Sequence, residues 1–258
     1  MAYASTRGYA LTPSSYAFQA YAEKQGYASF ANNYNQPPFQ SYTQNSSYYK
    51  RNTQRPYLIR EHSHDFAASD FLATSRPETP IISRIGEVKP VVEEAFEKLT
   101  GQKFPHDDIK IVILNNADFH DLHKRETGST SQGVMGFSYN KYGRGTSEIY
   151  IKEDNLDALL LTIGHEIGHV LSPTLFNAQD EEAKAHAFSL AWMETIRDNN
   201  IAGLEPNISL NPAKNGLHDV AWNFVQHLLK TGASAHDIFK TLSRGLASII
   251  ASEENHYG

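Results

Sequence analysis

The chain has 258 residues, a formal net charge of −6 and no cysteine. This length suits one or two domains, and the absence of cysteine excludes disulfides, thiolate metal clusters and a cysteine nucleophile. The negative charge argues against a general nucleic-acid binder, which needs a basic face. No apolar run is long enough to span a membrane, and the start of the chain lacks a secretory signal, so we expect a cytoplasmic protein.

The composition changes near residue 56. Residues 1–50 hold nine of the fourteen tyrosines, one acidic residue and no valine or isoleucine. Such a segment cannot bury enough apolar surface to offset the entropy lost on ordering. We therefore predict a disordered tail over residues 1–56, with a removable pro-segment or a partner-binding tail as alternatives. Residues 57–258, which contain all twelve histidines, are predicted to form the folded domain.

The first half of the folded region predicts one helix and a small sheet. Residues 90–100 carry apolar side chains at helical spacing and are followed by a glycine that can end a helix. Residues 109–114 are rich in β-branched residues and predict a strand. Residues 134–139 and 148–152 flank a turn that contains glycine and asparagine, which predicts a β-hairpin with a long loop.

The second half of the folded region is predicted to be helical. The expected helices cover about 155–171, 179–199, 217–231 and 235–252. Strands that precede helices in this way favour an α+β domain over a repeat of βαβ units. We expect a small twisted sheet, in which the hairpin supplies an edge strand, packed on the first two of these helices. The last two form a C-terminal helical pair.

The most informative motif is His165-Glu166-Ile167-Gly168-His169, inside the predicted helix 155–171. Residues i and i+4 of a helix lie one turn apart on the same face. His165 and His169 can therefore present two imidazole nitrogens to one metal ion. Glu166 is adjacent to the first ligand but rotated away from the metal. It is therefore placed to act as a general base on a zinc-bound water.

A catalytic zinc site needs a third protein ligand. Pro173 ends the first helix, and the next one begins after a short loop, so its first turn must pack near His169. Glu182 shares a helical face with the small Ala185, which would permit close helix approach, and it is the predicted third ligand. Glu181 is second choice and is expected to face solvent or the helix N-terminus. The full set of candidates is Asp180, Glu181, Glu182 and His186.

These residues resemble the gluzincin clan of metallopeptidases, above all the ImmA/IrrE-like peptidases and the minigluzincins. The resemblance covers roughly residues 109–192. It implies a peptidase with one zinc ion per chain and a peptide or protein substrate that binds as an added strand along Glu148, Tyr150 and Lys152. Where relatives carry aspartate or asparagine four residues after the third ligand, this chain has His186, which is the candidate for orienting a metal ligand.

Two features stay open in the sequence. An additional group that stabilises the oxyanion is expected, and several side chains could supply it: Tyr139, Tyr150, His186, His218 and His227. The alternative to a peptidase is a non-catalytic or latent zinc-stabilised protein that acts as a partner-binding or regulatory module. Both hypotheses use the metal ligands, but only catalysis requires Glu166. The oligomeric state is not predicted.

Overall fold

The computed structural model describes residues 66–128, 130–131, 133–210 and 220–249. They form the expected α+β fold, in which buried apolar residues from Ala68 to Ile249 share one core. The tail predicted over residues 1–56 lies outside the described residues. Within these described residues, no helix has the length and hydrophobicity needed to cross a membrane.

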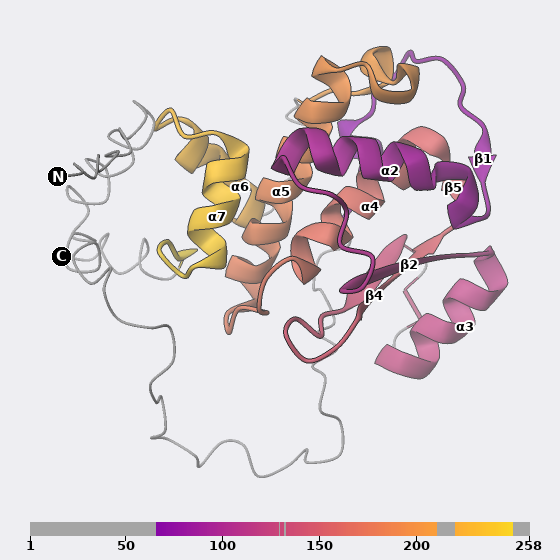
Figure 1. The fold of residues 1–258 in the computed structure, drawn as a ribbon, viewed down its shortest axis with the longest axis horizontal. Coiled ribbons are helices and arrows are strands. Elements are labelled where there is room, and N and C mark those ends of the chain that lie inside the picture. Colours follow the sequence, from indigo (N-terminus) through magenta and orange to yellow (C-terminus); the bar gives the residue numbers. More distant parts are fainter. Residues whose placement is uncertain (1–65, 129, 132, 211–219, 250–258) are drawn as a thin grey trace, which may run out of the picture.

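A three-stranded sheet is the framework of the fold (Figure 1). Its strands are β2 (Ile109–Leu114), β3 (Gly136–Tyr139) and β4 (Ser147–Lys152), in the order β2-β4-β3. Strand β4 is parallel to β2 and antiparallel to β3, with Gly136 opposite Ile151. The two predicted hairpin strands, β3 and β4, therefore pair as expected. However, β4 is the central strand of the sheet and not an edge strand.

The two faces of the sheet are covered by different helices. Helix α3 (Asn116–Thr127) packs on one face, where the ring of Phe119 lies 5.5 Å from that of Phe137. Because side chains alternate across a strand, the neighbouring residue Gly136 faces the opposite side. There it meets helix α4 (Leu156–Val170) through Thr162.

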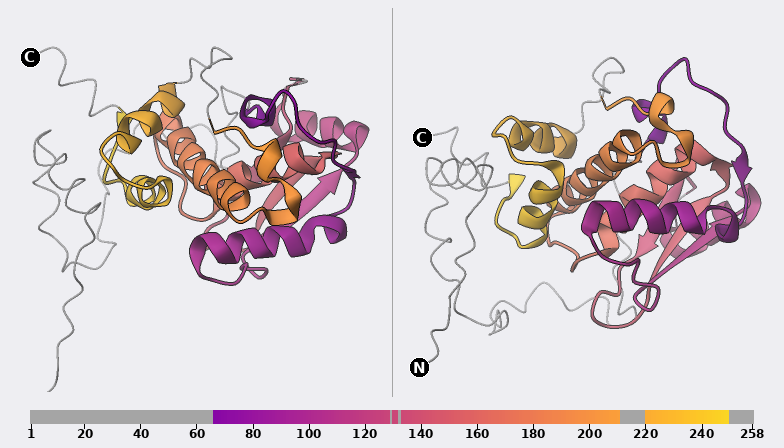
Figure 2. Two further views of the ribbon diagram at one scale, coloured as in Figure 1. Left: turned by 90° about the horizontal axis from the view of Figure 1, so that it is seen from above. Right: turned by 45° about the horizontal axis from the view of Figure 1, so that its top comes forward.

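The remaining helices build outward from α4. Helix α5 (Ala178–Asp198) packs along α4, and α2 (Ile85–Thr100) packs on α5 and on β2. Helices α6 (Val220–Leu229) and α7 (Ala235–Ser243) form the expected C-terminal pair against α5. Figure 2 shows α5 between this pair and the rest of the molecule.

Short elements complete the chain. Strands β1 (Ile81–Ile82) and β5 (Asp154–Asn155) form an antiparallel pair just before α4. The 3₁₀ turns are η2 (Ala68–Phe71), η3 (Ile201–Gly203) and η4 (Glu205–Asn207). These elements fix where α4 begins, because the N–H of Leu156 bonds to the carbonyl of Pro80 at 2.9 Å.

Within the described part of the chain, two helix boundaries differ from the prediction by more than two residues. Helix α2 begins at Ile85, so that Pro90 lies inside it rather than at its start. The burial of Val88 on the core side of the added turn favours this longer helix. Helix α7 ends at Ser243, since Gly245 takes a left-handed conformation (φ 66°) and its N–H bonds back to the helix at 2.8 Å.

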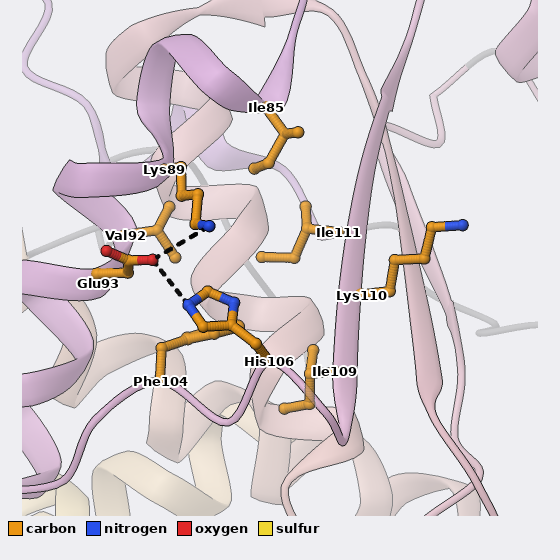
Figure 3. Close-up of a pocket in the computed structure, with 9 residues that line it drawn as sticks. All are labelled: Ile85, Lys89, Val92, Glu93, Phe104, His106, Ile109, Lys110 and Ile111. Atoms are coloured by element: carbon orange, nitrogen blue, oxygen red, sulfur yellow. Dashed lines mark ion pairs between the residues drawn. The ribbon is translucent and has the colours of Figure 1, made fainter.

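A small hollow lies between α2 and β2 (Figure 3). Its floor is apolar, and its rim carries an ion pair of 2.7 Å between Glu93 and His106. None of the residues that line it belongs to the 165–169 motif or to α5. The hollow is therefore separate from the candidate metal ligands.

Candidate metal centre

Both histidines of the 165–169 motif lie on α4, in a continuously buried part of that helix. Every residue from Leu159 to Val170 is buried. A helix that is apolar on nearly all sides is stable inside a core, so the surrounding side chains hold the imidazoles of His165 and His169 in place. Their spacing puts them on neighbouring turns of one helix face.

Helix α5 brings Glu182 to the two histidines. The chain turns at Pro173, and Asn177 caps α5 by accepting a backbone N–H at 3.0 Å. The helices approach closely because small residues meet: a Cβ added to Gly168 would lie 2.9 Å from the Cα of Ala185. The predicted close approach at Ala185 is confirmed.

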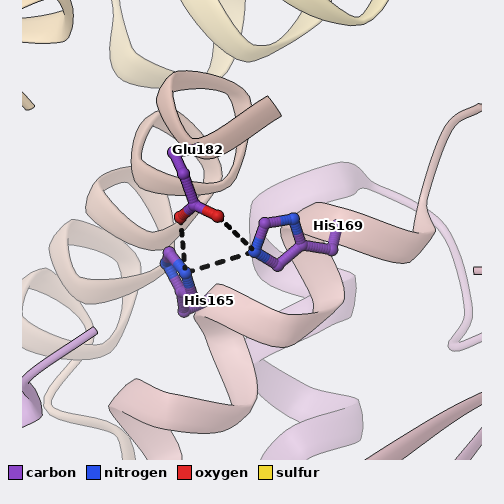
Figure 4. A group of neighbouring side chains, drawn as sticks. All are labelled: His165, His169 and Glu182. Carbon is purple, nitrogen blue, oxygen red and sulfur yellow. Dashed lines mark hydrogen bonds and ion pairs between the residues drawn. The ribbon is translucent and has the colours of Figure 1, made fainter. Parts of the chain in front are cut away.

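The three side chains converge on one point (Figure 4). The Nε2 atoms of His165 and His169 are 3.3 Å apart. The carboxylate of Glu182 places Oε2 3.6 Å from Nε2 of His165 and Oε1 3.9 Å from Nε2 of His169. Among the residues that the structure describes, these three form a group that could hold a metal ion.

The donor atoms fit a metal ion in chemistry and in spacing. Tetrahedral ligands at about 2.0–2.1 Å from a metal lie about 3.3–3.4 Å from one another, which agrees with the distance between the two Nε2 atoms. Burial lowers the pKa of His165 to about 3, although Glu182 acts in the opposite direction. The ring of His165 is therefore neutral near pH 7, and a lone pair is available for coordination.

Glu181 does not face solvent as expected. Its Oε1 lies 2.9 Å from Nδ1 of His169, and its Oε2 accepts the N–H of Leu175 at 2.7 Å. Burial opposes ionisation, but the His169 hydrogen bond and the charge of Lys184 outweigh it and lower the pKa of Glu181 to about 2. Solvent, one of the two expected positions, is excluded because Glu181 is buried, whereas its bond to Leu175 keeps it near the N-terminus of α5, the other expected position.

Glu166 is buried next to the metal group and beneath β3. A Cβ added to Gly136 would lie 3.1 Å from Cγ of Glu166 and 2.8 Å from Cγ2 of Thr162. Strand β3 can therefore cross α4 at this point only because residue 136 has no side chain. The arrangement places the expected general base directly under the edge of the sheet.

The prediction that a substrate pairs with the strand around Glu148, Tyr150 and Lys152 was wrong. Strand β4 has hydrogen-bonded neighbours on both edges, so a peptide cannot pair with it. Glu148, Tyr150 and Lys152 lie on the face opposite to Ile149 and Ile151, which point to the core. Among the described residues, β3 is the strand near α4 that has a strand neighbour on one edge only, because β4 lies between it and β2.

An aromatic cluster adjoins the first ligand. The ring of Phe66 stacks on that of His165 at a centroid distance of 4.3 Å. His186 lies 5.1 Å from His165 and packs edge-on against Trp222. His186 thus adjoins the candidate metal group as expected, and Glu181 lies within hydrogen-bond distance of Nδ1 of His169, the second histidine of that group.

The other candidates for oxyanion stabilisation are placed differently. The hydroxyl of Tyr150 donates to Glu148 at 3.1 Å, and the ring of Tyr139 packs edge-on against that of Tyr150. His227 lies on α6, and His218 is outside the described residues. Of these candidates, the structure brings His186 into ring contact with a metal ligand.

Three residues near the site were not predicted. Phe66 lies far from the motif in sequence, and no local pattern links the two. Lys184 is three residues after Glu181, a spacing that predicts an intrahelical ion pair on a surface but not its complete burial. Asn140 donates from the hairpin turn to the carbonyl of His169 at 2.6 Å. Only the tertiary arrangement reveals these contacts.

The candidate metal centre combines residues of two helices. Two histidines from α4 and one glutamate from α5 supply the donors, and Glu181 holds one of the rings. The resemblance to gluzincins comes from the motif and the spacing of these residues. No family model, curated protein or solved structure matches the chain.

Proposed function

We propose that the chain is a zinc-dependent peptidase, with His165, His169 and Glu182 as metal ligands and Glu166 as the general base. The observation that supports this proposal best is the convergence of three donors beside a buried carboxylate that is not one of them. A structural metal site does not need this fourth group, whereas hydrolysis needs a base.

The proposed chemistry divides between the metal and the protein. A bound zinc ion would polarise the scissile carbonyl and lower the pKa of a water. Glu166 would accept a proton from the attacking water as the new carbon–oxygen bond forms. It would then pass this proton to the leaving amine as the carbon–nitrogen bond breaks. Adjacent helix residues point about 100° apart, so Glu166 can reach the reacting atoms without occupying a ligand position.

The substrate is proposed to bind along β3. The N–H of Lys152 bonds to the carbonyl of Met135 at 2.9 Å. In an antiparallel pair, the backbone groups of every second residue, starting here at Met135, therefore point toward β4. The backbone groups of the residues between them, Gly136 and Ser138, point toward the other edge of β3, which has no strand partner among the described residues. An extended peptide that pairs there would pass beside Glu166.

The test compares the full-length wild type with Glu166→Gln. Metal analysis measures zinc, and a broad library of extended peptides measures cleavage. We expect equal zinc content and melting temperature, and a loss of cleavage of at least about 10²–10⁴-fold in the variant. Glu97→Gln, an exposed change on α2, is the matched control and should cleave as wild type does. The absence of zinc-dependent cleavage in wild type would refute the proposal.

A zinc-stabilised protein without catalytic activity, acting as a partner-binding or regulatory module, is the second candidate. Its support is the burial of the ligands: the side chains of His165 and Glu182 are 4% and 6% exposed. The ring of Phe66 also covers His165. If this function holds, zinc raises the melting temperature of the protein, and Glu166→Gln has no effect on any measured property.

A further inference from the structure

Lys184 is a lysine with no exposed surface, next to the metal group. Its Nζ lies 2.9 Å from Oε1 of Glu181, and it donates to the carbonyls of His169 at 3.2 Å and Pro173 at 3.4 Å. A buried ammonium group is costly unless charge and hydrogen bonds compensate it. Here one carboxylate and two carbonyls do so, which fixes the side chain in one position.

The carboxylate of Glu181 is equally constrained. Oε1 faces both Nζ of Lys184 and Nδ1 of His169, and Oε2 accepts the N–H of Leu175. An ionised carboxylate can only accept hydrogen bonds, so Nδ1 of His169 must carry the proton. Its Nε2 then has the lone pair, and this is the atom that faces His165 and Glu182.

The backbone of His169 is held by the same network. Its carbonyl accepts from Lys184 at 3.2 Å and from Asn140 at 2.6 Å. Carbonyls in the last turn of a helix lack intrahelical partners, and cationic or amide donors stabilise them. Asn140 also donates to the carbonyl of Ser172 at 2.7 Å, which ties the hairpin turn to the end of α4.

Two neighbouring glutamates thus have different tasks. Glu181 pairs with Lys184 and turns toward Nδ1 of His169, whereas Glu182 turns toward the Nε2 atoms. We propose that Lys184 and Glu181 form a buried charge pair that positions His169, fixing its tautomer and ring orientation for metal binding. This inference rests on the proposed metal site, and neither residue is a ligand in it.

The first test separates positioning from stability. The variants are Glu181→Met alone and the double change Glu181→Met with Lys184→Met, with Lys89→Met at an exposed position of α2 as the control. Replacing both members of a buried ion pair by apolar residues is often neutral for stability. The metal-free melting temperature of the double variant should therefore stay near that of wild type. Its zinc affinity, measured by chelator competition, should fall about 10–100-fold, as when other groups that orient a ligand are removed.

The second test needs no metal. Nitrogen NMR of the metal-free protein reports which ring nitrogen of His169 is protonated. Wild type should show a proton on Nδ1, and the double variant should lose this preference. If His169 has the same tautomer in both proteins and zinc affinity is equal, the inference is wrong. If wild type binds no zinc, the proposed function fails, but the tautomer still decides whether Glu181 and Lys184 position the ring.

Both tests remain decisive if one variant folds poorly. Glu181→Met alone also removes the acceptor of Nδ1 of His169, so it can replace the double variant in the affinity measurement. If the ion pair only stabilised the fold, its removal would lower the metal-free melting temperature and leave the zinc affinity of the folded molecules unchanged. That result with Glu181→Met would overturn the inference by itself.

Discussion

The indole ring of Trp192 lies against the backbone of Gly164, the residue before the first histidine of the metal group. Its Nε1–H donates to the carbonyl of Leu160 at 3.0 Å, and the ring is fully buried. A Cβ on residue 164 would lie 2.3 Å from Cδ1 of this ring. The spacing of α4 and α5, which sets how near Glu182 comes to the histidines, therefore depends on a glycine.

Gly164→Ala is expected to destabilise the protein and weaken metal binding. The added methyl cannot fit beside Trp192, and overpacking a core costs about 1–3 kcal/mol. The melting temperature of the metal-free protein and the zinc affinity should both fall. Gly86→Ala is the control, since nothing lies within 4 Å of a Cβ there; in helix α2 it should stabilise by about 0.5–1 kcal/mol. Equal melting temperatures for wild type and Gly164→Ala would contradict the packing argument.

The ligand assignment predicts the metal content of single variants. Wild type should contain one zinc ion per chain, because the three donors form one group. His165→Ala, His169→Ala and Glu182→Ala should each lose it. His186→Ala removes a neighbouring ring that does not belong to the group, and it should keep one ion. Metal analysis after dialysis measures all four. Retention of zinc by Glu182→Ala would show that the third ligand is misassigned.

The helices around the site could be predicted from the sequence because their signals are local. The apolar pattern of residues 155–171 and the proline after it predict α4 and the loop, and α5 follows within a residue of its expected start. Helical spacing then brings His165 and His169 together on one face of α4. Glu182 could be predicted as the third candidate because a short loop keeps the first turn of α5 close to the end of α4.

The sheet and the surroundings of His169 could not be predicted in the same way. Strand β2 pairs with β4 across a crossover that contains α3 and β3, and no local pattern shows which strand becomes central. The angle between Glu181 and Glu182 on the helix predicted that Glu181 faces solvent or the helix N-terminus. Whether such a side chain is buried depends on the path of the loop before α5, which has no local sequence pattern. A sequence analysis would place Lys184 on the surface, because lysine is almost never fully buried.

Asp157 anchors the start of α4 and should make stability depend on pH. It accepts from Arg76 at 2.7 Å, Asn207 at 2.9 Å and Thr79 at 3.1 Å. Burial opposes ionisation, but these hydrogen bonds outweigh it and hold the pKa of Asp157 below its ordinary 3.8. A lowered pKa stabilises the fold above about pH 4, and this contribution is lost as the pH falls through the folded-state value.

Asp157→Asn should therefore cost about 1.5–3 kcal/mol of unfolding free energy at pH 7, the usual range for a lost hydrogen bond to a charged group. The difference from wild type should shrink below pH 4, where the wild-type carboxyl becomes protonated. Urea unfolding at pH 7 and pH 3 measures it. An equal difference at both pH values would mean that the charge of Asp157 contributes nothing.

Phe66 is expected to slow the exchange of metal. Its ring stacks on that of His165 with an angle of 11° between the planes, so it covers one side of the ligand. Phe66→Ala should speed zinc removal by a chelator several-fold while the ligands, and hence the zinc content at equilibrium, stay as they are. Phe176→Ala is the matched control, because this ring is 92% exposed. Identical removal rates for wild type and Phe66→Ala would show that the ring does not limit access.

Gly136→Ala tests whether β3 is the substrate strand of the proposed peptidase. The new methyl would meet Cγ2 of Thr162 at 2.8 Å, Cδ1 of Ile151 at 2.9 Å and Cγ of Glu166 at 3.1 Å. Two of these atoms are the ends of side chains that can move, so the protein should still fold and bind zinc. Glu166 and the strand must shift apart, however, and a misplacement of about 1 Å can cost about 10²-fold in rate. We expect peptide cleavage to fall while zinc content is unchanged, and Ser138→Ala on the same strand to behave as wild type. Full activity in Gly136→Ala would place the substrate elsewhere.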